Sequence, residues 1–473
     1  MLKENLRKLS PWKYILDPLK GMRIPAYFYV SEKLLQLVEE DAIRQAMNVA
    51  MLPSLVKGVM VMSDVHTGYG FPIGGVAASR YEEGIISPGG IGFDINCGVR
   101  LLKTDLSLEE VEKKKQLLID TLYKNVPSGL GEGGYLKLSD EELMEVMEKG
   151  SYWALEKGYA TRQEVEHTEE NGRMKEADPS KVSKRAMARG RKQLGTLGSG
   201  NHFLEIQIVE KIFDPSTAKA YGLEEGMITI MIHCGSRGLG HQVASDYLRI
   251  MNEKNPEIVK SLPDRELVYA SINSEVGVDY LRAMASAANY AWVNRQLIAF
   301  QVRKSLRQVF GHVNTEQLYD VAHNIAKIEE HIIDGEKMKL IVHRKGATRA
   351  FPKNSGLNVY DDVGQPVIIP GSMGTSSYIL VGTEKAMNES FGSSCHGAGR
   401  VMSRRKAISK FNAAEIVKSL GERGVVVKSG SRKGIAEESP DAYKDVDEVV
   451  RVVQGAGIAR IVAKLKPLGV IKG

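Results

Sequence analysis

The feature that most constrains the fold is a recurring pattern in which a short apolar run ends in a histidine or a glycine-rich polar element. Residues 227–233 form an apolar run that ends in His233, and residues 339–343 form another that ends in His343. Runs of this length are typical of buried strands. Because a polar element closes one strand after another, we expect polar side chains to gather along one edge of a sheet core.

Helical patterns separate these strands. Further strands are predicted at residues 56–62, 99–103, 202–209, 366–370 and 377–381, and helices at residues 32–51, 240–251 and 276–309. From about residue 107 to 191 the sequence changes to charged amphipathic helices, which indicate an inserted subregion. No repeat of fixed period and no low-complexity linker divides the chain. The sequence therefore predicts an α/β (α+β) fold, a single large interwoven domain over residues 1–473 with a mixed sheet core and this helical insertion.

The charge balance is mildly basic, with 64 Lys and Arg residues against 58 Asp and Glu, a net charge of +6. Such a balance permits an anionic partner without requiring one, so nucleic-acid binding must be argued from local clusters. The three cysteines, Cys97, Cys234 and Cys395, are too scattered for a disulfide framework and favour a reducing compartment. No apolar run approaches the ~20 residues that cross a bilayer, so we expect a cytoplasmic protein without membrane contact.

A single histidine among small residues, His396, is the most informative local motif. Glycines at Gly397 and Gly399 let backbone N–H groups approach a ligand closely, and Arg400 and Arg404 can fork onto phosphate oxygens. This arrangement presents an imidazole to a phosphate. The histidine can act there as a nucleophile, as a general acid or base, or as a metal ligand.

A second group of residues has the chemistry of metal ligands. Asp94 and Cys97 lie three residues apart in a glycine-rich turn, so one metal ion can reach both. His202, His233 and His323 follow at strand ends. Carboxylate, thiolate and imidazole together suit a divalent transition metal, with manganese and zinc both reasonable, and a thiolate can bridge two ions. The remaining histidines that we considered receive no role: His66, His167, His241, His312 and His331.

A basic cluster at residues 184–192 stands directly before a glycine-rich loop at residues 195–200. Its position beside that loop favours contact with phosphate. The polar pair Asn201 and His202 then begins a strand that we expect to be half-buried, with His202, Leu204 and Ile206 on one face.

Six sequence blocks, read together, resemble the signature blocks of the RtcB family of RNA-splicing ligases. They are residues 93–100, 198–205, 232–238, 343–349, 370–374 and 396–400. They occur in the family's order, and the likeness extends from about Asp64 to Lys472. The resemblance implies a GTP- and Mn²⁺-dependent ligase that joins RNA 3′-phosphate or 2′,3′-cyclic phosphate ends to 5′-hydroxyl ends in tRNA splicing and RNA repair. It also implies the family's single-domain α/β fold.

The resemblance also assigns residues to roles. It implies that two manganese ions share Cys97 as a bridging ligand and that His396 attacks the α-phosphorus of GTP and holds GMP covalently. The metal ligands would be Asp94, Cys97, His202, His233 and His323. The nucleotide would contact Asn201, His202, Phe203, Leu204, Glu205, His323, Asn324, Pro370, Gly371, Ser372, Met373, Ser377, His396, Gly397, Ala398, Gly399 and Lys472. The RNA path would be lined by Arg189, Arg237, Lys345, Arg400 and Arg404.

Glu205 supplies a physical reason for GTP over ATP, since its carboxylate can accept hydrogen bonds from the guanine N1–H and amine, which adenine lacks. Cys395 before the candidate nucleophile is a local variation, because another small residue is expected there. RNA is the expected partner, and an archease-type activator is a further possibility. Two alternatives stay open on the residues: a metal-dependent phosphodiesterase or phosphatase without a nucleotide, and a non-catalytic RNA-binding scaffold with a structural metal.

Overall fold

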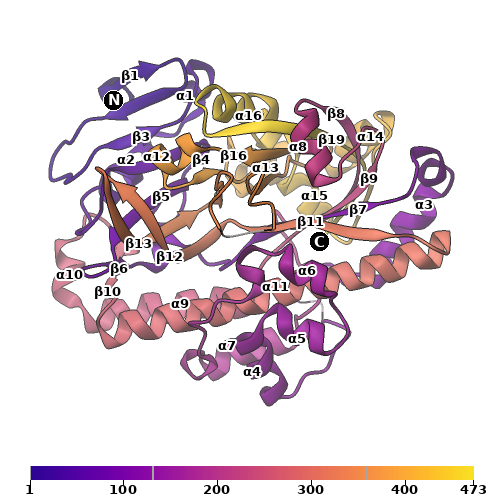
Figure 1. Cartoon of the computed structure of the whole chain (residues 1–473), viewed down its shortest axis with the longest axis horizontal. Helices are drawn as coiled ribbons and strands as arrows, with labels where there is room; N and C mark the ends of the chain where they lie inside the picture. The colour runs from indigo at the N-terminus through magenta and orange to yellow at the C-terminus, as the bar shows by residue number, and fades with distance from the viewer. Residues whose placement is uncertain (1, 130, 132, 357–358) are drawn as a thin grey trace.

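Two large sheets form the body of the protein in the computed structural model, which describes residues 2–129, 131, 133–356 and 359–473 (Figure 1). The first has seven strands, and its neighbours run antiparallel except for one parallel pair, β3 with β4. In spatial order its strands are β1 (Leu6–Ser10), β2 (Lys13–Leu16), β3 (Ala26–Phe28), β4 (Val59–His66), β5 (Ile73–Arg80), β13 (Glu336–Lys345) and β12 (Asn324–Ile333).

The second sheet has eight strands, seven of them on its main path, and it is also mixed, because the eighth strand, β18, pairs parallel to β19. In order its strands are β11 (Thr315–Ala322), β7 (Gly98–Thr104), β9 (Ile228–Cys234), β8 (Phe203–Ile212), β19 (Ala459–Lys472), β16 (Ser377–Gly382) and β15 (Pro366–Ile369), with β18 at Val426–Ser429. Two short pairs complete the strands: β6 (Ile85–Ile86) with β10 (Ala270–Ser271), and β14 (Ala347–Arg349) with β17 (Ser393–Cys395). The predicted mixed α/β architecture is therefore confirmed.

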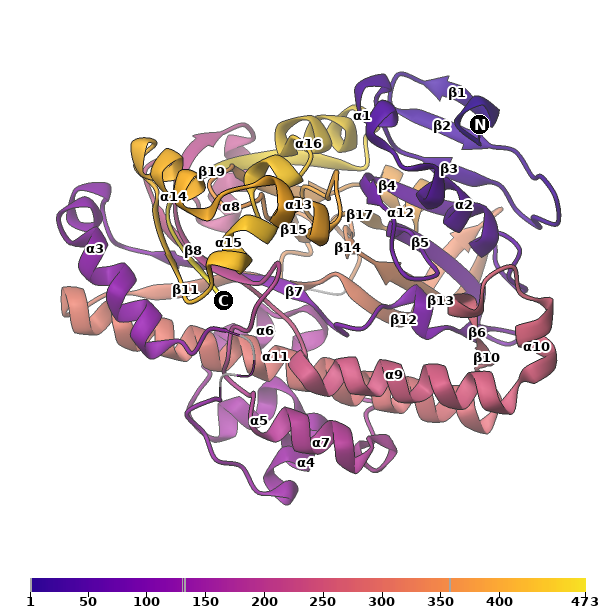
Figure 2. The same cartoon turned by 180° about the vertical axis from the view of Figure 1, so that it is seen from behind.

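One long helix, α11 (Glu275–Phe310), organises the helices on one side of the molecule. Its central residues are buried all round, which is expected for a helix covered on every side. In both views α4, α5 and α7 lie on the side of α11 away from the sheets, and α9 runs beside it (Figures 1 and 2). These helices are α4 (Asp140–Lys149), α5 (Ser151–Glu156), α7 (Lys184–Arg191) and α9 (Arg237–Lys254).

The other helices are distributed along the rest of the described chain. Their bounds are α1 (Glu32–Leu37), α2 (Glu40–Val49), α3 (Leu108–Asn125), α6 (Arg162–Glu166), α8 (Pro215–Tyr221), α10 (Pro256–Ser261), α12 (Glu384–Ser390), α13 (Arg404–Lys410), α14 (Ala413–Glu422), α15 (Arg432–Glu437) and α16 (Val446–Gly455). Several begin with a capping box; in α3 the Ser107 hydroxyl accepts from the Glu110 backbone N–H and the Glu110 carboxylate accepts from the Ser107 N–H. The expected helical subregion at residues 107–191 contains α3 to α7, while its status as an insertion in one domain stays a prediction.

Three sequence predictions are corrected by these elements. The helix expected at residues 32–51 is two helices, because the backbone is extended at Val38 and Glu39. The strand expected at residues 56–62 begins at Val59 and continues to His66, so the polar residues Ser63 and Asp64 also lie in β4. Strand β8 is buried on both faces near its start: Phe203 packs in one apolar cluster, and Leu204 with Ile206 in another.

A buried cluster of charges joins α11 to the second sheet. Arg100, Arg295 and Asp320 all have side chains with no exposed surface. The Asp320 carboxylate accepts from Arg100 Nε at 2.7 Å and from Arg295 Nη2 at 2.8 Å. One carboxylate therefore compensates two guanidinium groups, each of which would be very unfavourable alone in an apolar interior.

The substitution Asp320→Asn should destabilise the protein strongly, because it removes the only negative charge recorded against Arg100 and Arg295 in the described residues. Breaking a buried pair from one side typically costs about 3–5 kcal/mol. Chemical denaturation measures this loss. Glu109→Gln is the matched control, because its ion pair with Lys113 lies on the surface, and its midpoint should stay unchanged. Equal midpoints for the two variants would contradict this account of the cluster.

Candidate active site and metal centre

A pocket of about 660 Å³ collects residues from distant parts of the chain. It is lined by the candidate nucleophile, His396, and by four of the five candidate metal ligands: Asp94, Cys97, His233 and His323. Of the residues expected at the nucleotide, those that line it are Asn201, Phe203, His323, Asn324, Pro370, Gly371, Ser372, Met373, His396, Gly397, Ala398, Gly399 and Lys472. The other four do not line it and are buried: His202, Leu204, Glu205 and Ser377.

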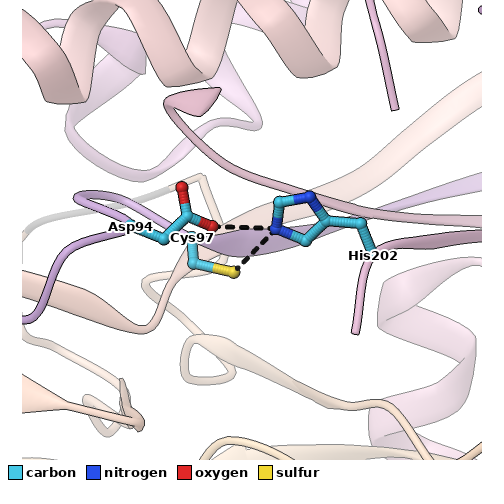
Figure 3. A group of neighbouring side chains, drawn as sticks. All are labelled: Asp94, Cys97 and His202. Atoms are coloured by element: carbon cyan, nitrogen blue, oxygen red, sulfur yellow. Dashed lines mark hydrogen bonds and ion pairs between the residues drawn. The ribbon is translucent and has the colours of Figure 1, made fainter. Parts of the chain in front are cut away.

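Asp94, Cys97 and His202 converge on one point, as Figure 3 shows. His202 Nε2 lies 2.8 Å from Asp94 Oδ2 and 3.6 Å from Cys97 Sγ. The other ring nitrogen, Nδ1, lies 3.0 Å from the Leu197 carbonyl oxygen, which fixes the ring orientation. The ligand atoms of these three residues lie within 4.8 Å of one another, so they could hold one metal ion.

The two other predicted metal ligands extend this group toward His396. Cys97 Sγ lies 3.3 Å from His233 Nε2, so the thiol stands between the rings of His202 and His233. The ring centroids of His233 and His323 are 5.4 Å apart, and those of His323 and His396 are 5.2 Å apart. His323 Nε2 is buried without a hydrogen-bond partner. A buried orphan nitrogen beside a thiol and further imidazoles fits a divalent metal, so the residues present fit the predicted group.

The pKa values of the candidate metal ligands indicate that metal binding would release protons. Burial raises the pKa of the Cys97 thiol to about 12, and Asp94 adds to the effect. Burial acts to lower the pKa of His202, but Cys234 and Asp94 raise it well above its usual range. Burial lowers the pKa values of His233 and His323, so both rings are neutral and can offer lone pairs. A metal ion binding here would displace protons from Cys97 and His202.

Backbone geometry brings the ligands together. Asn96 has a positive φ of 51°, in the turn that lies between Asp94 and Cys97. Its main-chain and side-chain oxygens accept from Arg295 Nη1 at 2.7 Å and Nη2 at 3.0 Å. Gly235 leaves room for the Asp94 carboxylate, since a Cβ there would lie 2.4 Å from its oxygens. The buried arginine of the charge cluster therefore also holds the turn that carries the candidate ligands.

Asp64 fixes the orientation of His396. Its Oδ2 atom lies 2.5 Å from His396 Nδ1 and accepts from the backbone N–H of His396 at 2.9 Å. Burial acts to raise the pKa of Asp64, but His396 and Lys444 hold it below its usual value, so the carboxylate is charged. Because Nδ1 is engaged, Nε2 is the ring nitrogen available to a ligand.

The close approach of residues 396–400 to the end of β4 depends on a glycine. Gly399 has a φ of +75°, and a Cβ there would lie 2.1 Å from the Asp64 carbonyl oxygen. Lys444 joins the contact, since its backbone N–H donates to the Gly399 carbonyl at 2.8 Å and its ammonium group donates to the Val65 carbonyl. The glycine-framed motif at residues 396–400 is thereby held against the end of β4.

Glu205 is buried beside the pocket and not at its surface. Gln207 Nε2 donates to Glu205 Oε1 at 2.6 Å and to Ser377 Oγ at 3.0 Å, and Ser377 Oγ accepts from the Gly371 N–H at 3.0 Å. Burial raises the pKa of Glu205 to about 8, although Gln207 and Lys472 act in the opposite direction. Three predicted nucleotide contacts are therefore linked by one polar chain.

The residues predicted for the RNA path lie in different surroundings. Lys345 is buried in the pocket wall, and burial lowers its pKa to about 7. Arg189 is exposed and donates to Gln242 Oε1 at 3.1 Å. Arg237 Nη1 lies 3.4 Å from His202 Nδ1, so a change at Arg237 would also reach the candidate metal ligands. Arg400 and Arg404 line the pocket and pair with Glu438 and Glu437 respectively.

Comparison with known proteins places this site in a family. A family model described as tRNA-splicing ligase RtcB matches residues 45–473. The chain is 55% identical to the tRNA-splicing ligase RtcB of Archaeoglobus fulgidus, over 99% of both chains. It is 54% identical to the protein of that name from Thermococcus kodakarensis, over 96% of both. The chain belongs to the RtcB family. A third RtcB relative, from Nanoarchaeum equitans, is 52% identical over 99% of both chains.

Sequence reasoning missed two residues of this RtcB-family site. Asp64 received no role, although it makes the closest contact to His396. The sequence gives no role to His66 either, yet this residue lines the pocket, and burial with Lys444 nearby lowers its pKa to about 3. The glycines that follow in the sequence at Gly68 and Gly70 were the available signal, because they frame this segment as they frame His396.

Two further observations concern the described part of the RtcB-family chain. All three cysteines are free and buried. Among the helices within residues 2–129, 131, 133–356 and 359–473, none is long and apolar enough to cross a membrane.

The substitution Cys97→Ser should weaken manganese binding, since a neutral hydroxyl replaces a thiol that lies between His202 and His233. The loss should exceed the roughly 10- to 100-fold typical of an outer-shell partner. Titration of the metal-free protein followed by electron paramagnetic resonance, which counts free Mn²⁺, measures the change. Cys395→Ser is the control, because that thiol is buried in an apolar cluster. Equal affinities for Mn²⁺ in the two variants would mean that Cys97 contributes to packing and does not bind the metal.

Proposed function

We propose that this RtcB-family chain is a GTP- and manganese-dependent RNA ligase that acts in tRNA splicing and RNA repair. It joins RNA 3′-phosphate or 2′,3′-cyclic phosphate ends to 5′-hydroxyl ends. The observation that carries the proposal is a single pocket in which an Asp64-oriented imidazole, His396, stands within a row of rings that leads to Cys97 and Asp94. Such a pocket offers a nucleophile and a cation site to one triphosphate.

His396 acts first in the proposed reaction. Its Nε2 atom attacks the α-phosphorus of GTP, the bond to the β-phosphate oxygen breaks, and pyrophosphate leaves. Asp64 accepts a hydrogen bond from Nδ1–H and balances the positive charge that develops on the ring. The product is a phosphoramidate between GMP and His396. The backbone of Gly397 and Gly399 can approach the phosphate closely because no side chain intervenes.

The RNA steps use the same covalent GMP. An oxygen of the RNA 3′-phosphate attacks the phosphorus of GMP, and the bond to His396 Nε2 breaks, so the RNA end becomes a mixed diphosphate. The 5′-hydroxyl then attacks the phosphorus of the RNA, GMP leaves, and a phosphodiester remains. A 2′,3′-cyclic end first needs water to open it to a 3′-phosphate. Arg189, Arg237, Lys345, Arg400 and Arg404 would contact RNA phosphates.

Asp94, Cys97, His202, His233 and His323 would hold two manganese ions, with Cys97 shared between them. The ions, when bound, would neutralise phosphate charge and stabilise charge that develops at the reacting phosphorus. The mixture of oxygen, sulfur and nitrogen donors supports a divalent transition metal. An archease-type activator stays a prediction, as does the cytoplasmic location.

The substitution His396→Ala should abolish covalent guanylylation without unfolding the protein. Intact mass after incubation with GTP and Mn²⁺ under denaturing conditions measures the single GMP adduct. His312→Ala, which changes an exposed histidine outside the pocket, should gain the adduct normally. A GMP adduct on the His396→Ala protein would show that another residue is the nucleophile. No adduct on the unsubstituted protein would favour a phosphodiesterase or phosphatase.

GTP binding should strengthen as pH rises toward about 8 and then level off. The reason is that Glu205, whose pKa is raised to about 8, is protonated below that pH and must lose its proton to accept from both guanine donors. Affinity for GTP should rise by up to about tenfold per pH unit in this window. Calorimetry between pH 6 and 9 measures it. Glu205→Gln should remove this dependence and reduce the preference for GTP over ATP. An unchanged pH profile in that variant would contradict the role of Glu205.

A further inference from the structure

Three aromatic rings at the pocket mouth have no part in the proposed steps. Tyr69 and Phe93 meet edge to face with centroids 5.0 Å apart, and Phe93 stacks on His241 at 4.8 Å with an interplanar angle of 25°. Tyr69 follows β4, Phe93 directly precedes Asp94, and His241 lies in the first turns of α9. Three separate segments therefore build one continuous series of rings, which we name the aromatic platform.

The aromatic platform is not part of the core. Tyr69 and Phe93 are half-buried and line the pocket, and His241 is exposed. The rings thus lead from the pocket that holds His396 and Cys97 outward to the surface of α9. Half-exposed aromatic rings that continue a reactive pocket are an arrangement expected for ligand binding and not for packing.

Cations stand at both ends of the platform. The ammonium group of Lys345 lies 5.9 Å from the Tyr69 ring centroid. Arg189 Nη1 donates to the side-chain oxygen of Gln242, the residue after His241, at 3.1 Å. Helix α7, which carries Arg189 with exposed Lys184 and Arg185, packs on α9. Flat rings flanked by basic side chains are complementary to a single nucleic-acid strand, whose bases are flat and whose backbone is anionic.

We propose that the aromatic platform is a stacking site for an unpaired nucleobase of the RNA, next to the end that is joined. The inference rests on the proposed ligase function and adds a subsite to it. Stacking suits such an enzyme because every base has a π-face, so an end can be held whatever its sequence. Arg189 and Lys345 would neutralise the adjoining phosphates while the rings carry the base.

The test places 2-aminopurine, a base whose fluorescence falls on stacking, at single positions near either RNA end. One RNA carries it beside the 5′-hydroxyl and another beside the 3′-phosphate, so the two arms identify the end that stacks. The protein is first loaded with GMP, and the loading is measured by mass. Quenching is expected in one arm. Phe93→Leu and His241→Leu should each reduce it and weaken binding of that RNA on the order of 10-fold, whereas Phe93→Tyr should retain both.

Phe213→Leu is the matched control. Phe213 is 46% exposed and has an ammonium group, that of Lys211, 5.0 Å from its ring centroid, but it does not line the pocket. The Phe213→Leu substitution should leave the 2-aminopurine quenching and the affinity for RNA unchanged. If Phe93→Leu disturbs GMP loading through its neighbour Asp94, the His241→Leu protein decides the question.

A second measurement separates stacking from general loss of affinity. An RNA with an abasic residue at the quenched position should bind the unsubstituted protein as weakly as normal RNA binds the Phe93→Leu protein, and the two changes together should add nothing further. Absence of quenching at every position, or equal quenching in all variants, would overturn the platform. Reduced GTP binding with unchanged RNA binding in the Phe93→Leu and His241→Leu proteins would also overturn it, because the rings would then contact guanine. Failure of GMP loading in the unsubstituted protein would instead refute the proposed function.

Discussion

The buried ion pair between Arg295 and Asp320 is the interaction on which the site most depends. Asp320 lies in β11 three residues before His323, and Arg295 lies in the middle of α11. The same guanidinium donates to the carbonyl oxygens of Asn96, at 2.7 Å, and Cys234, at 2.8 Å. One side chain thus connects the central helix to three strand ends that carry candidate metal ligands. A charge held so far from water persists only with all its partners present, which makes the arrangement of these strand ends specific.

The second sheet, which the Arg295–Asp320 pair joins to α11, positions the candidate metal ligands. Strands β7, β9 and β8 are neighbours, and their ends bring Cys97, His233 and His202 together. His323 joins through its backbone N–H, which donates to the Cys97 carbonyl at 2.7 Å. Because β9 runs antiparallel to both neighbours, the side chains that meet are those just before the starts of β7 and β8 and the one near the end of β9.

The parts of this arrangement that could be predicted from the sequence are those with a local signal. The long helix α11 and strands such as β7 follow from apolar patterns within one segment. The grouping of Cys97 with distant histidines came from shared chemistry and from the family resemblance. Asp64 was not predictable in this way, because its partner His396 is 332 residues away in the sequence. A single carboxylate within an apolar strand also produces no periodic pattern that would mark it. Burial of β8 on both faces was missed because sequence alternation cannot reveal what covers the second face.

Burial sets the protonation of three groups in and beside the pocket. Burial acts against the charged forms of Glu205 and Lys345, moving their pKa values to about 8 and about 7, and it lowers the pKa of His323. Burial therefore favours the neutral form of each of these three groups. A guanine edge at Glu205 would favour its charged form, so binding there would be coupled to loss of a proton, and a phosphate at Lys345 would be coupled to gain of one. The neutral ring of His323 is already the form that binds a metal ion. Because the ligands compensate neighbouring groups in one pocket, binding of one would favour binding of the next without any large change in the fold.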